Sequence, residues 1–198
     1  MNCRSIKKHY EDIISDDLLL KSDVICLQET WLENDSHTED LRIPNYDLYL
    51  NSIGKGKGIA IYCKENTFKH EIDIKEEHMQ ITKLSYSTID IVVLYRSQSG
   101  NIETLKQHLE TLNDNEEKPL LVVGDFNFCF MDKFSNPTKE YFQEHAFKQL
   151  IKEPTHIEGN LLDQANIKDV KEIHKYSAEI HSKYYTDHKA LAVMVKKS

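Results

Sequence analysis

The sequence predicts an α+β fold in which two β-sheets pack against each other and helices flank them. Apolar segments of strand length outnumber amphipathic segments of helix length, and the helical segments separate groups of strands. Helices that alternated strictly with single strands would instead favour a doubly wound parallel sheet. Because 198 residues suffice for one sizeable core, we expect a single domain over 1–198.

The first half of the chain is expected to contain one helix and several strands. Apolar residues recur every three or four positions over 5–21, which predicts an amphipathic helix. A short continuous apolar run over 23–28 is typical of a strand buried on both faces. The polar stretch 33–40 is expected to be a loop or a short helix. Further strands are expected at 46–50, 59–63, 79–84 and 89–95.

The second half is expected to contain two more helices and three strands. Leucine and isoleucine recur at helical spacing over 102–112, and aromatic residues do so over 138–150. The apolar run 119–124 again predicts a strand that is buried on both faces. Short strands are expected at 161–167 and 190–195.

Composition limits the classes of partner. The 33 acidic residues exceed the 25 basic ones, which gives a net charge of −8. This balance argues against non-specific nucleic-acid binding, but it is compatible with a nucleic-acid enzyme that uses metal ions and a few local Lys or Arg contacts. No apolar run approaches the ~18 residues of a membrane span, so no membrane association is expected. The four cysteines form no CxxC pair, which favours reduced thiols in an intracellular protein, nuclear or cytoplasmic.

Carboxylates follow two of the predicted buried strands directly. Glu29 comes after the strand at 23–28, and Asp125 and Asn127 come after the strand at 119–124. Side chains at the ends of buried strands stand on a rigid scaffold. Oxygen ligands held in this way suit a hard cation such as Mg²⁺.

Other polar side chains accompany these carboxylates. Tyr95 ends the strand at 89–95 and Arg96 follows it, and Asp187 and His188 stand just before the last strand. A histidine beside an aspartate offers a proton donor, while Asn and Tyr offer neutral hydrogen bonds to an anion. The combination suggests metal-assisted attack of water on a phosphorus centre.

Each motif on its own also has a simpler explanation. A carboxylate at a strand end is most often a solvated loop residue, and Asp125 with Asn127 could form an ordinary Asx turn. Asp187 and His188 could form a cap. The lysines of the glycine-rich stretch 54–58 are better explained by a soluble hairpin loop than by phosphate contact. The joint occurrence of the motifs in this order favours a functional site.

The motifs form a series over nearly the whole chain. They are Asn2-x-Arg4-Ser5, Leu27-Gln28-Glu29-Thr30, Gly58-Ile59-Ala60-Ile61-Tyr62, Tyr95-Arg96, Gly124-Asp125-Phe126-Asn127, Leu162-Asp163 and Thr186-Asp187-His188. This series resembles the endonuclease/exonuclease/phosphatase superfamily, which includes apurinic endonucleases and DNase I-like enzymes. The stretch 149–156, together with Arg4-Ser5, is similar to the endonuclease domains of mobile elements, namely non-LTR retrotransposons and Helitron-like transposons.

The resemblance implies both a fold and an activity. The implied fold is a four-layer α/β/β/α sandwich of two packed mixed sheets flanked by helices. The implied activity is that of a phosphodiesterase that uses Mg²⁺, with Mn²⁺ as a substitute, and acts on DNA as a nicking endonuclease. A role in transposition, within a larger mobile-element polyprotein, is part of the same expectation.

The resemblance also implies roles for the residues around the metal. Glu29 would be the principal metal ligand, and Asp187 would help to bind metal or to position water. Asp125 would orient and deprotonate the attacking water, and Asn2 would hold Asp125 by a hydrogen bond.

A second set of implied roles concerns the phosphate. Asn127 and His188 would donate to its non-bridging oxygens, and Asp163 would orient His188 through the other ring nitrogen. Tyr95 would contact the phosphate or the leaving group. The expected substrate-binding residues are Arg4 and Arg96.

Two departures from the family pattern bear on these expectations. Arg4 stands where many apurinic-type enzymes have a second acidic ligand, an acid that the mobile-element branch often lacks. The family also has a strand leading into the first-motif asparagine, whereas Asn2 follows Met1 directly. The sequence therefore predicts that the first strand is lacking, and it leaves open a catalytically weakened relative that acts by binding.

A phosphatase or phosphodiesterase on small or lipid phosphates is the alternative within the enzymes. The net negative charge favours it. Tyr95-Arg96 opposes it, because the lipid and inositol phosphate branches usually carry an additional histidine-bearing motif at this point.

Overall fold

The computed structural model describes residues 1–33, 39–115, 117–131, 137–172 and 174–197. Within these ranges, no helix is both long enough and apolar enough to cross a membrane. Most of the stretch 33–40, predicted as a loop or short helix, lies outside the described residues, and its end belongs to the short 3-10 helix η1 (Glu39–Leu41).

A six-stranded mixed sheet forms one of the two β layers. Its strand order is β4-β5-β6-β7-β9-β8, in which β6 and β7 are parallel and the other neighbours antiparallel. Helix α3 (Ile102–Leu112) connects β6 to β7, as a parallel pair requires. The strands are β4 (Lys69–Glu76), β5 (Met79–Ser85), β6 (Asp90–Arg96), β7 (Leu120–Asp125), β9 (Asp163–Lys168) and β8 (Lys148–Gln149).

The second β layer is divided into two antiparallel sheets. One is three-stranded, in the order β1-β3-β2, and the other is the pair β10-β11. Ile61 of β3 packs with Leu84 of β5 and Val93 of β6, so an apolar core joins this layer to the six-stranded sheet. The strands are β1 (Val24–Gln28), β2 (Tyr46–Asn51), β3 (Ile59–Lys64), β10 (His174–His181) and β11 (Ala190–Lys197).

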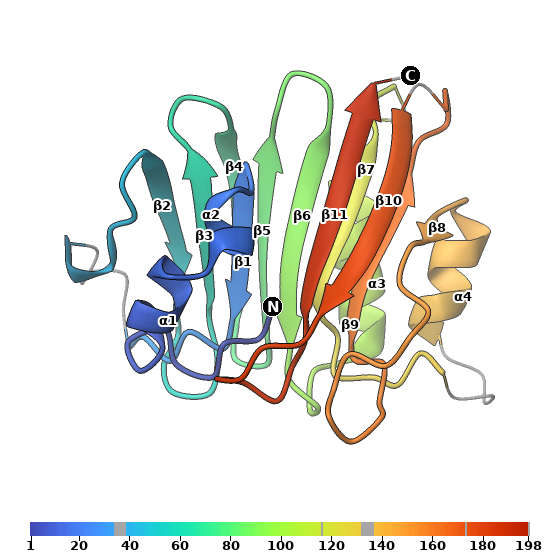
Figure 1. Cartoon of the computed structure of the whole chain (residues 1–198). Coiled ribbons are helices and arrows are strands. Elements are labelled where there is room, and N and C mark those ends of the chain that lie inside the picture. Colours follow the sequence, from blue (N-terminus) through green and yellow to red (C-terminus); the bar gives the residue numbers. More distant parts are fainter. Residues whose placement is uncertain (34–38, 116, 132–136, 173, 198) are drawn as a thin grey trace.

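The amino terminus lies between these two small sheets (Figure 1). Asn2 forms a parallel bridge with Gln28, the last residue of β1. The Gln28 amide donates to the Met1 carbonyl at 3.0 Å, and the Cys3 amide donates to the Gln28 carbonyl at 2.9 Å. The terminal ammonium donates to the Cys26 carbonyl at 2.8 Å. An isolated bridge, rather than a strand, therefore holds Asn2 in place beside the end of β1.

Helices cover the outer faces of both layers. Ile13 and Leu19, from α1 (Tyr10–Ile14) and α2 (Asp17–Leu20), pack against Ile25 and Leu27 of β1. On the opposite side of the molecule, α3 and α4 (Pro137–Glu144) pack on the six-stranded sheet through the core cluster that contains Leu105, Leu109, Tyr141 and Phe142. Figure 1 shows α1 and α2 in front of the strands and α3 behind them. The predicted α+β fold of packed sheets flanked by helices is confirmed.

Local signals explain where element boundaries differ from prediction. The helix predicted over 5–21 is divided because the Asp16 carboxylate accepts from the amides of Leu18 and Leu19, at 3.1 and 3.4 Å, and so starts a new helix. The helix predicted over 138–150 ends at Glu144. Strands β4 and β10 were not predicted, because their alternating apolar residues are separated by charged or polar ones and remain partly exposed.

Candidate active site

Three neighbouring strands bring polar side chains to one level of the six-stranded sheet. Tyr95 of β6 lies opposite Asp125 of β7, and Asp125 lies opposite Asp163 of β9. Directly opposed residues share one face of a sheet, so the three side chains project together. Their exposed fractions are 4%, 0% and 2%, respectively. The strand register therefore forms a buried polar row from residues that are far apart in the sequence.

Asn2 joins this row to the end of β1. Its Nδ2 donates to Glu29 Oε1 at 2.7 Å and to Asp125 Oδ2 at 3.0 Å. Its Oδ1 accepts from the Arg4 amide at 3.1 Å, and the residue is 0% exposed. Each amide hydrogen of Asn2 thus bonds a different carboxylate. The Asn2 side chain therefore fixes the distance between the two carboxylates.

Glu29 directly follows β1 in a strained backbone conformation. Its φ of 52° lies in the left-handed region, which is uncommon for residues other than glycine, asparagine and aspartate. Its Oε2 accepts from the indole Nε1 of Trp31 at 3.3 Å. Such strain clusters at functional sites. Trp31 was not among the predicted site residues, and only its position two residues after Glu29 could have suggested it.

Asp125 depends on the glycine before it. A Cβ on Gly124, whose φ is 151°, would lie 1.9 Å from the carbonyl oxygen of Leu94, so only glycine lets β7 approach β6 here. Asp125 Oδ1 accepts from the Asn127 amide at 2.9 Å. Burial and the charge of Asp163 raise the Asp125 pKa to about 7, although His188 and the Asn2 hydrogen bond act in the opposite direction. Asp125 is therefore poised to take a proton near neutral pH.

Asn127 also has left-handed backbone, with a φ of 49°. Its Nδ2 donates to the Arg96 carbonyl at 2.8 Å, which uses one of its two hydrogens, and the second has no acceptor in the part of the chain that the structure describes. The structure thus places Asn127 next to Asp125 at the end of β7.

The guanidinium of Arg96 is bound in the loop after β6 and not to the other predicted site residues. Its guanidinium is buried, donates to the carbonyls of Ser97, Gln98 and Gly100 at 2.6 to 3.2 Å, and lies 3.8 Å from the ring centre of Phe128. These contacts close the loop after β6. A substrate contact by this guanidinium, as the sequence predicts, would require it to leave all three carbonyls.

His188 and Asp163 form a buried pair. The Nδ1 of His188 lies 2.8 Å from Asp163 Oδ2, and the two side chains are 8% and 3% exposed. Burial alone would lower the pKa of His188, but the bond and charge of Asp163, with the charges of Asp125 and Asp187, raise it overall. Thr155 supports the pair, because its Oγ1 accepts from the Asp163 amide at 3.0 Å.

The glycine-rich stretch 54–58 lies beside the site. The Tyr95 hydroxyl donates to the Gly56 carbonyl at 3.0 Å, and Lys55 Nζ lies 5.5 Å from the ring centre of Trp31. Burial, with the charges of Glu29 and Asp125, raises the pKa of Tyr95. The stretch therefore contacts the site through the Gly56 carbonyl.

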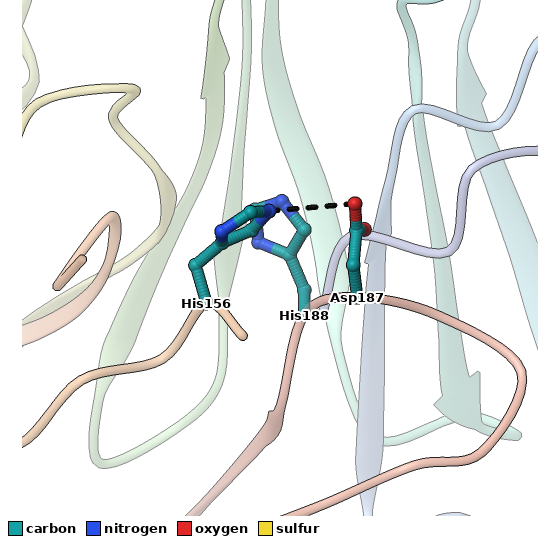
Figure 2. Close-up of side chains that lie close together, drawn as sticks. All are labelled: His156, Asp187 and His188. Atoms are coloured by element: carbon teal, nitrogen blue, oxygen red, sulfur yellow. Dashed lines mark ion pairs between the residues drawn. The ribbon is translucent and has the colours of Figure 1, made fainter. Parts of the chain in front are cut away.

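An outer group of polar residues covers His188. Asp187 Oδ2 is in contact with Arg4 and lies 3.4 Å from the Nε2 of His156. The rings of His156 and His188 are 4.9 Å apart at 74° (Figure 2). Sequence reasoning assigned no role to His156, although it ends the Pro154-Thr155-His156 motif that carried part of the resemblance.

Carboxylates dominate the charge of the whole site. The charges of Asp125, Asp163 and Asp187 act on His188, and Glu29 is linked to Asp125 through Asn2. Asp163 Oδ1 and Asp187 Oδ1 are buried without a hydrogen-bond partner among the described residues. A cation satisfies such oxygens, and an oxygen-rich donor set fits Mg²⁺. Glu29 and Asp125 could hold it. Asp125, Asp163 and His188 also present possible ligand atoms within 4.8 Å of one another.

The predicted site residues are thus brought together with one exception. The exception is the side chain of Arg96. The others form one contact network, consisting of Asn2, Arg4, Glu29, Tyr95, Asp125, Asn127, Asp163, Asp187 and His188.

Comparison with solved structures finds the same fold in several proteins. The AP endonuclease from Archaeoglobus fulgidus has a TM-score of 0.73 and 18% identity, covering 98% of this chain and 96% of that one. The human Nocturnin catalytic domain with bound sulfate has a TM-score of 0.69 and 17% identity, covering 100% and 92%. The endonuclease domain of TRAS1, a telomere-specific non-LTR retrotransposon, has a TM-score of 0.71 and 13% identity, covering 100% and 95%.

Sequence comparison adds a family. No curated protein matches the chain significantly. The family model described as the Endonuclease/Exonuclease/phosphatase family matches residues 6–144. This family consists of hydrolases of the nuclease and phosphatase class, and the acids and the histidine at the strand ends fit that chemistry. The extent of the model match makes the assignment specific: the chain belongs to the endonuclease/exonuclease/phosphatase family.

Proposed function

We propose that the protein is a Mg²⁺-dependent phosphodiesterase that nicks DNA, as the endonuclease of a larger mobile-element polyprotein. The observation that carries this proposal is the Asn2 side chain, which holds Glu29 and Asp125 together at 2.7 and 3.0 Å. One carboxylate for the metal and one for the attacking water, at a fixed separation, are the two groups that this hydrolysis needs.

The metal site would be built on Glu29, with Mn²⁺ as an alternative occupant. A bound divalent cation supplies charge stabilisation at the phosphate oxygens. The half-buried carboxylate of Glu29 is oriented for this task by Asn2 and Trp31, which donate to its two different oxygens. Asp187, whose Oδ1 has no hydrogen-bond partner among the described residues, would hold metal or a water molecule.

Asp125 acts as the base in this proposal. It holds the attacking water and accepts its proton, for which a pKa raised to about 7 is well suited. His188 donates from Nε2 to a non-bridging phosphate oxygen, because its Nδ1 is fixed by Asp163. The free hydrogen of Asn127 Nδ2 donates to the same phosphate. Tyr95 faces the phosphate or the leaving group, and Arg4 binds the substrate backbone.

The substrate class rests on two observations. The fold is shared with the endonuclease domain of TRAS1, a telomere-specific non-LTR retrotransposon. Arg4 is 53% exposed at the edge of the site, where a phosphate backbone can reach it. The net charge of −8 favours the second candidate, a phosphatase on small or lipid phosphates.

Nicking of supercoiled plasmid tests the proposal. The wild type is assayed with Mg²⁺, with Mn²⁺ and with chelator, beside Asp125→Ala and His188→Ala. His108→Ala is the matched control. His108 lies on α3, and its Nε2 is 2.8 Å from a carboxylate oxygen of Glu76, so this variant also removes a histidine beside a carboxylate. We expect metal-dependent nicking that the first two variants lose and the control keeps.

The other outcomes discriminate between the alternatives. A folded wild type that releases phosphate from small or lipid phosphates but leaves plasmid intact supports the second candidate. A folded wild type that hydrolyses neither substrate class would overturn the enzymatic proposal and favour a relative that acts by binding.

A further inference from the structure

Two imidazoles and a carboxylate meet at the outer edge of the site. His156, Asp187 and His188 each offer a ligand atom, and these atoms lie within 4.8 Å of one another (Figure 2). Donors around a zinc ion, with bonds of ~2 Å in a tetrahedron, are about 3.3 Å apart. The pair His156 Nε2 and Asp187 Oδ2, at 3.4 Å, already has this spacing.

The other carboxylate oxygen of Asp187 lacks a hydrogen-bond donor among the described residues. Asp187 Oδ1 is buried and has no hydrogen-bond partner within the part of the chain that the structure describes. The Asp187 and His156 side chains are only 18% and 12% exposed. A buried carboxylate oxygen without a donor is costly, and a bound cation removes that cost.

Neighbours orient both imidazoles, and for His188 the arrangement is that of a metal-binding histidine. His188 directs Nδ1 at Asp163, at 2.8 Å, so Nε2 is its ligand atom. His156 Nδ1 accepts from the Glu158 amide at 3.3 Å, and a carboxylate oxygen of Glu158 lies 3.8 Å from the same nitrogen. When Nε2 binds a cation, the ring proton must move to Nδ1, so this amide bond is given up and the Glu158 carboxylate must approach Nδ1 to accept the proton.

The backbone holds these ligands in register. His156 and His188 form an antiparallel bridge. The Ile157 amide donates to the Asp187 carbonyl at 3.0 Å, and the Lys189 amide donates to the Thr155 carbonyl at 2.8 Å. Because two chain segments are paired directly at the ligands, the three side chains are pre-organised rather than collected by a loop.

We propose that His156, Asp187 and His188 form a binding site for Zn²⁺ or a similar transition-metal ion, and that its occupation inhibits the enzyme. Two imidazoles select such ions over Mg²⁺, which prefers oxygen ligands. A metal on His188 Nε2 takes that nitrogen away from the phosphate. Binding stands independently of the proposed nuclease activity, whereas the inhibition rests on it.

Arg4 gives the proposal a second, opposite test. Its guanidinium contacts the same Asp187 oxygen that faces His156. A metal ion must displace this positive charge, and at 53% exposure the side chain can move into solvent. Removing Arg4 therefore strengthens zinc binding, while removing His156 weakens it.

Calorimetric titration with Zn²⁺ of the metal-free protein measures both effects. His156→Gln is expected to weaken the site by about 100-fold, since loss of a ligand exceeds the 10–100-fold typical of an outer partner. Arg4→Ala is expected to strengthen it several-fold, and His108→Gln to leave it unchanged. Visible absorption of bound Co²⁺ reports whether the site is tetrahedral. Unaltered zinc affinity in both His156→Gln and Arg4→Ala, with thermal unfolding that shows folded variants, would overturn the proposal.

Plasmid nicking in Mg²⁺ with added Zn²⁺ tests the inhibition. Each variant is compared with its own rate without Zn²⁺, and His156→Gln is expected to need about 100-fold more Zn²⁺ for the same fractional loss. Equal zinc sensitivity in the wild type and His156→Gln refutes the inhibition. A wild type that binds Zn²⁺ through His156 but never nicks DNA refutes the proposed function and leaves the binding site standing.

Discussion

Two histidine–aspartate pairs lie side by side in this molecule and differ in burial. In the inner pair, His188 Nδ1 lies 2.8 Å from Asp163 Oδ2, and the two side chains are 8% and 3% exposed. In the outer pair, His156 Nε2 lies 3.4 Å from Asp187 Oδ2, and the two side chains are 12% and 18% exposed. The inner aspartate belongs to a strand, β9, whereas the outer one precedes β11 and also contacts Arg4.

The difference shows how position decides what the same two side chains can do. Asp163 is fixed by its register with Asp125 and by Thr155, so its partner imidazole has one orientation and a raised pKa. Asp187 shares its charge between a histidine and an exposed arginine, and one of its oxygens has no donor among the described residues. The inner pair suits a fixed proton donor, and the outer pair suits an exchangeable ligand.

Replacing each aspartate by asparagine gives the largest contrast. We expect Asp163→Asn to lower kcat by about 10²–10⁴-fold, because His188 loses the charge that keeps it protonated and aimed at the phosphate. Asp187→Asn is expected to cost about tenfold, since it leaves the inner pair intact. Single-turnover nicking at saturating Mg²⁺ measures both. Equal losses would show that the two pairs do not have different roles.

The pH dependence of nicking distinguishes the group that must lose its proton from the group that must keep its proton. Asp125 must be ionised to accept the water proton, so kcat/KM should rise through about pH 7 by about tenfold per unit. His188 must stay protonated, and its raised pKa extends activity to higher pH. In Asp163→Asn the falling limb should shift to lower pH, and in Asp187→Asn it should shift less. A falling limb unmoved by Asp163→Asn would assign that limb to another group.

The charge interaction of the inner pair should contribute to the free energy of unfolding in one pH range only. A histidine whose pKa is raised on folding stabilises the folded state below its unfolded pKa, and this stabilisation is lost as the pH rises through the folded pKa. Asp163→Asn should therefore lower the free energy of unfolding by about 2 kcal/mol at about pH 6 and by less at about pH 9. Denaturant titrations of the metal-free protein at both pH values measure this. A difference independent of pH would mean that the charge of His188 contributes nothing.

The sequence allowed the inner pair to be predicted but not the outer one. Buried strands leave a strong apolar pattern, and the polar residues at their ends, such as Glu29 and Asp125, stand out against it. His156 stands between strands in an irregular segment, and its approach to Asp187 depends on a backbone bridge between 156 and 188 that no local pattern encodes. Its neighbour Thr155 was equally hidden.

Arg96 and the edge strands illustrate the same limit for the fold. A basic residue after a buried strand predicts a solvent-facing group, yet three carbonyls of the following loop enclose its guanidinium. Loop closure of this kind depends on backbone geometry rather than on residue type. Strands β4 and β10 have only one apolar face and charged residues on the other, so their strand pattern is weaker than that of the central strands.

The smallest expected effect concerns the arginine of the outer pair. Arg4 is 53% exposed, so its ion pair with Asp187 should contribute about 0–1 kcal/mol to stability and be screened by salt. Unfolding of Arg4→Ala at low and high ionic strength measures this, with Asp163→Asn as the buried counterpart, whose cost salt should barely change. A salt-independent cost for Arg4→Ala similar to that of Asp163→Asn would place both pairs in the same rigid network. A small, screened cost is what an arginine needs if it is to yield Asp187 to a metal ion while the inner pair stays in place.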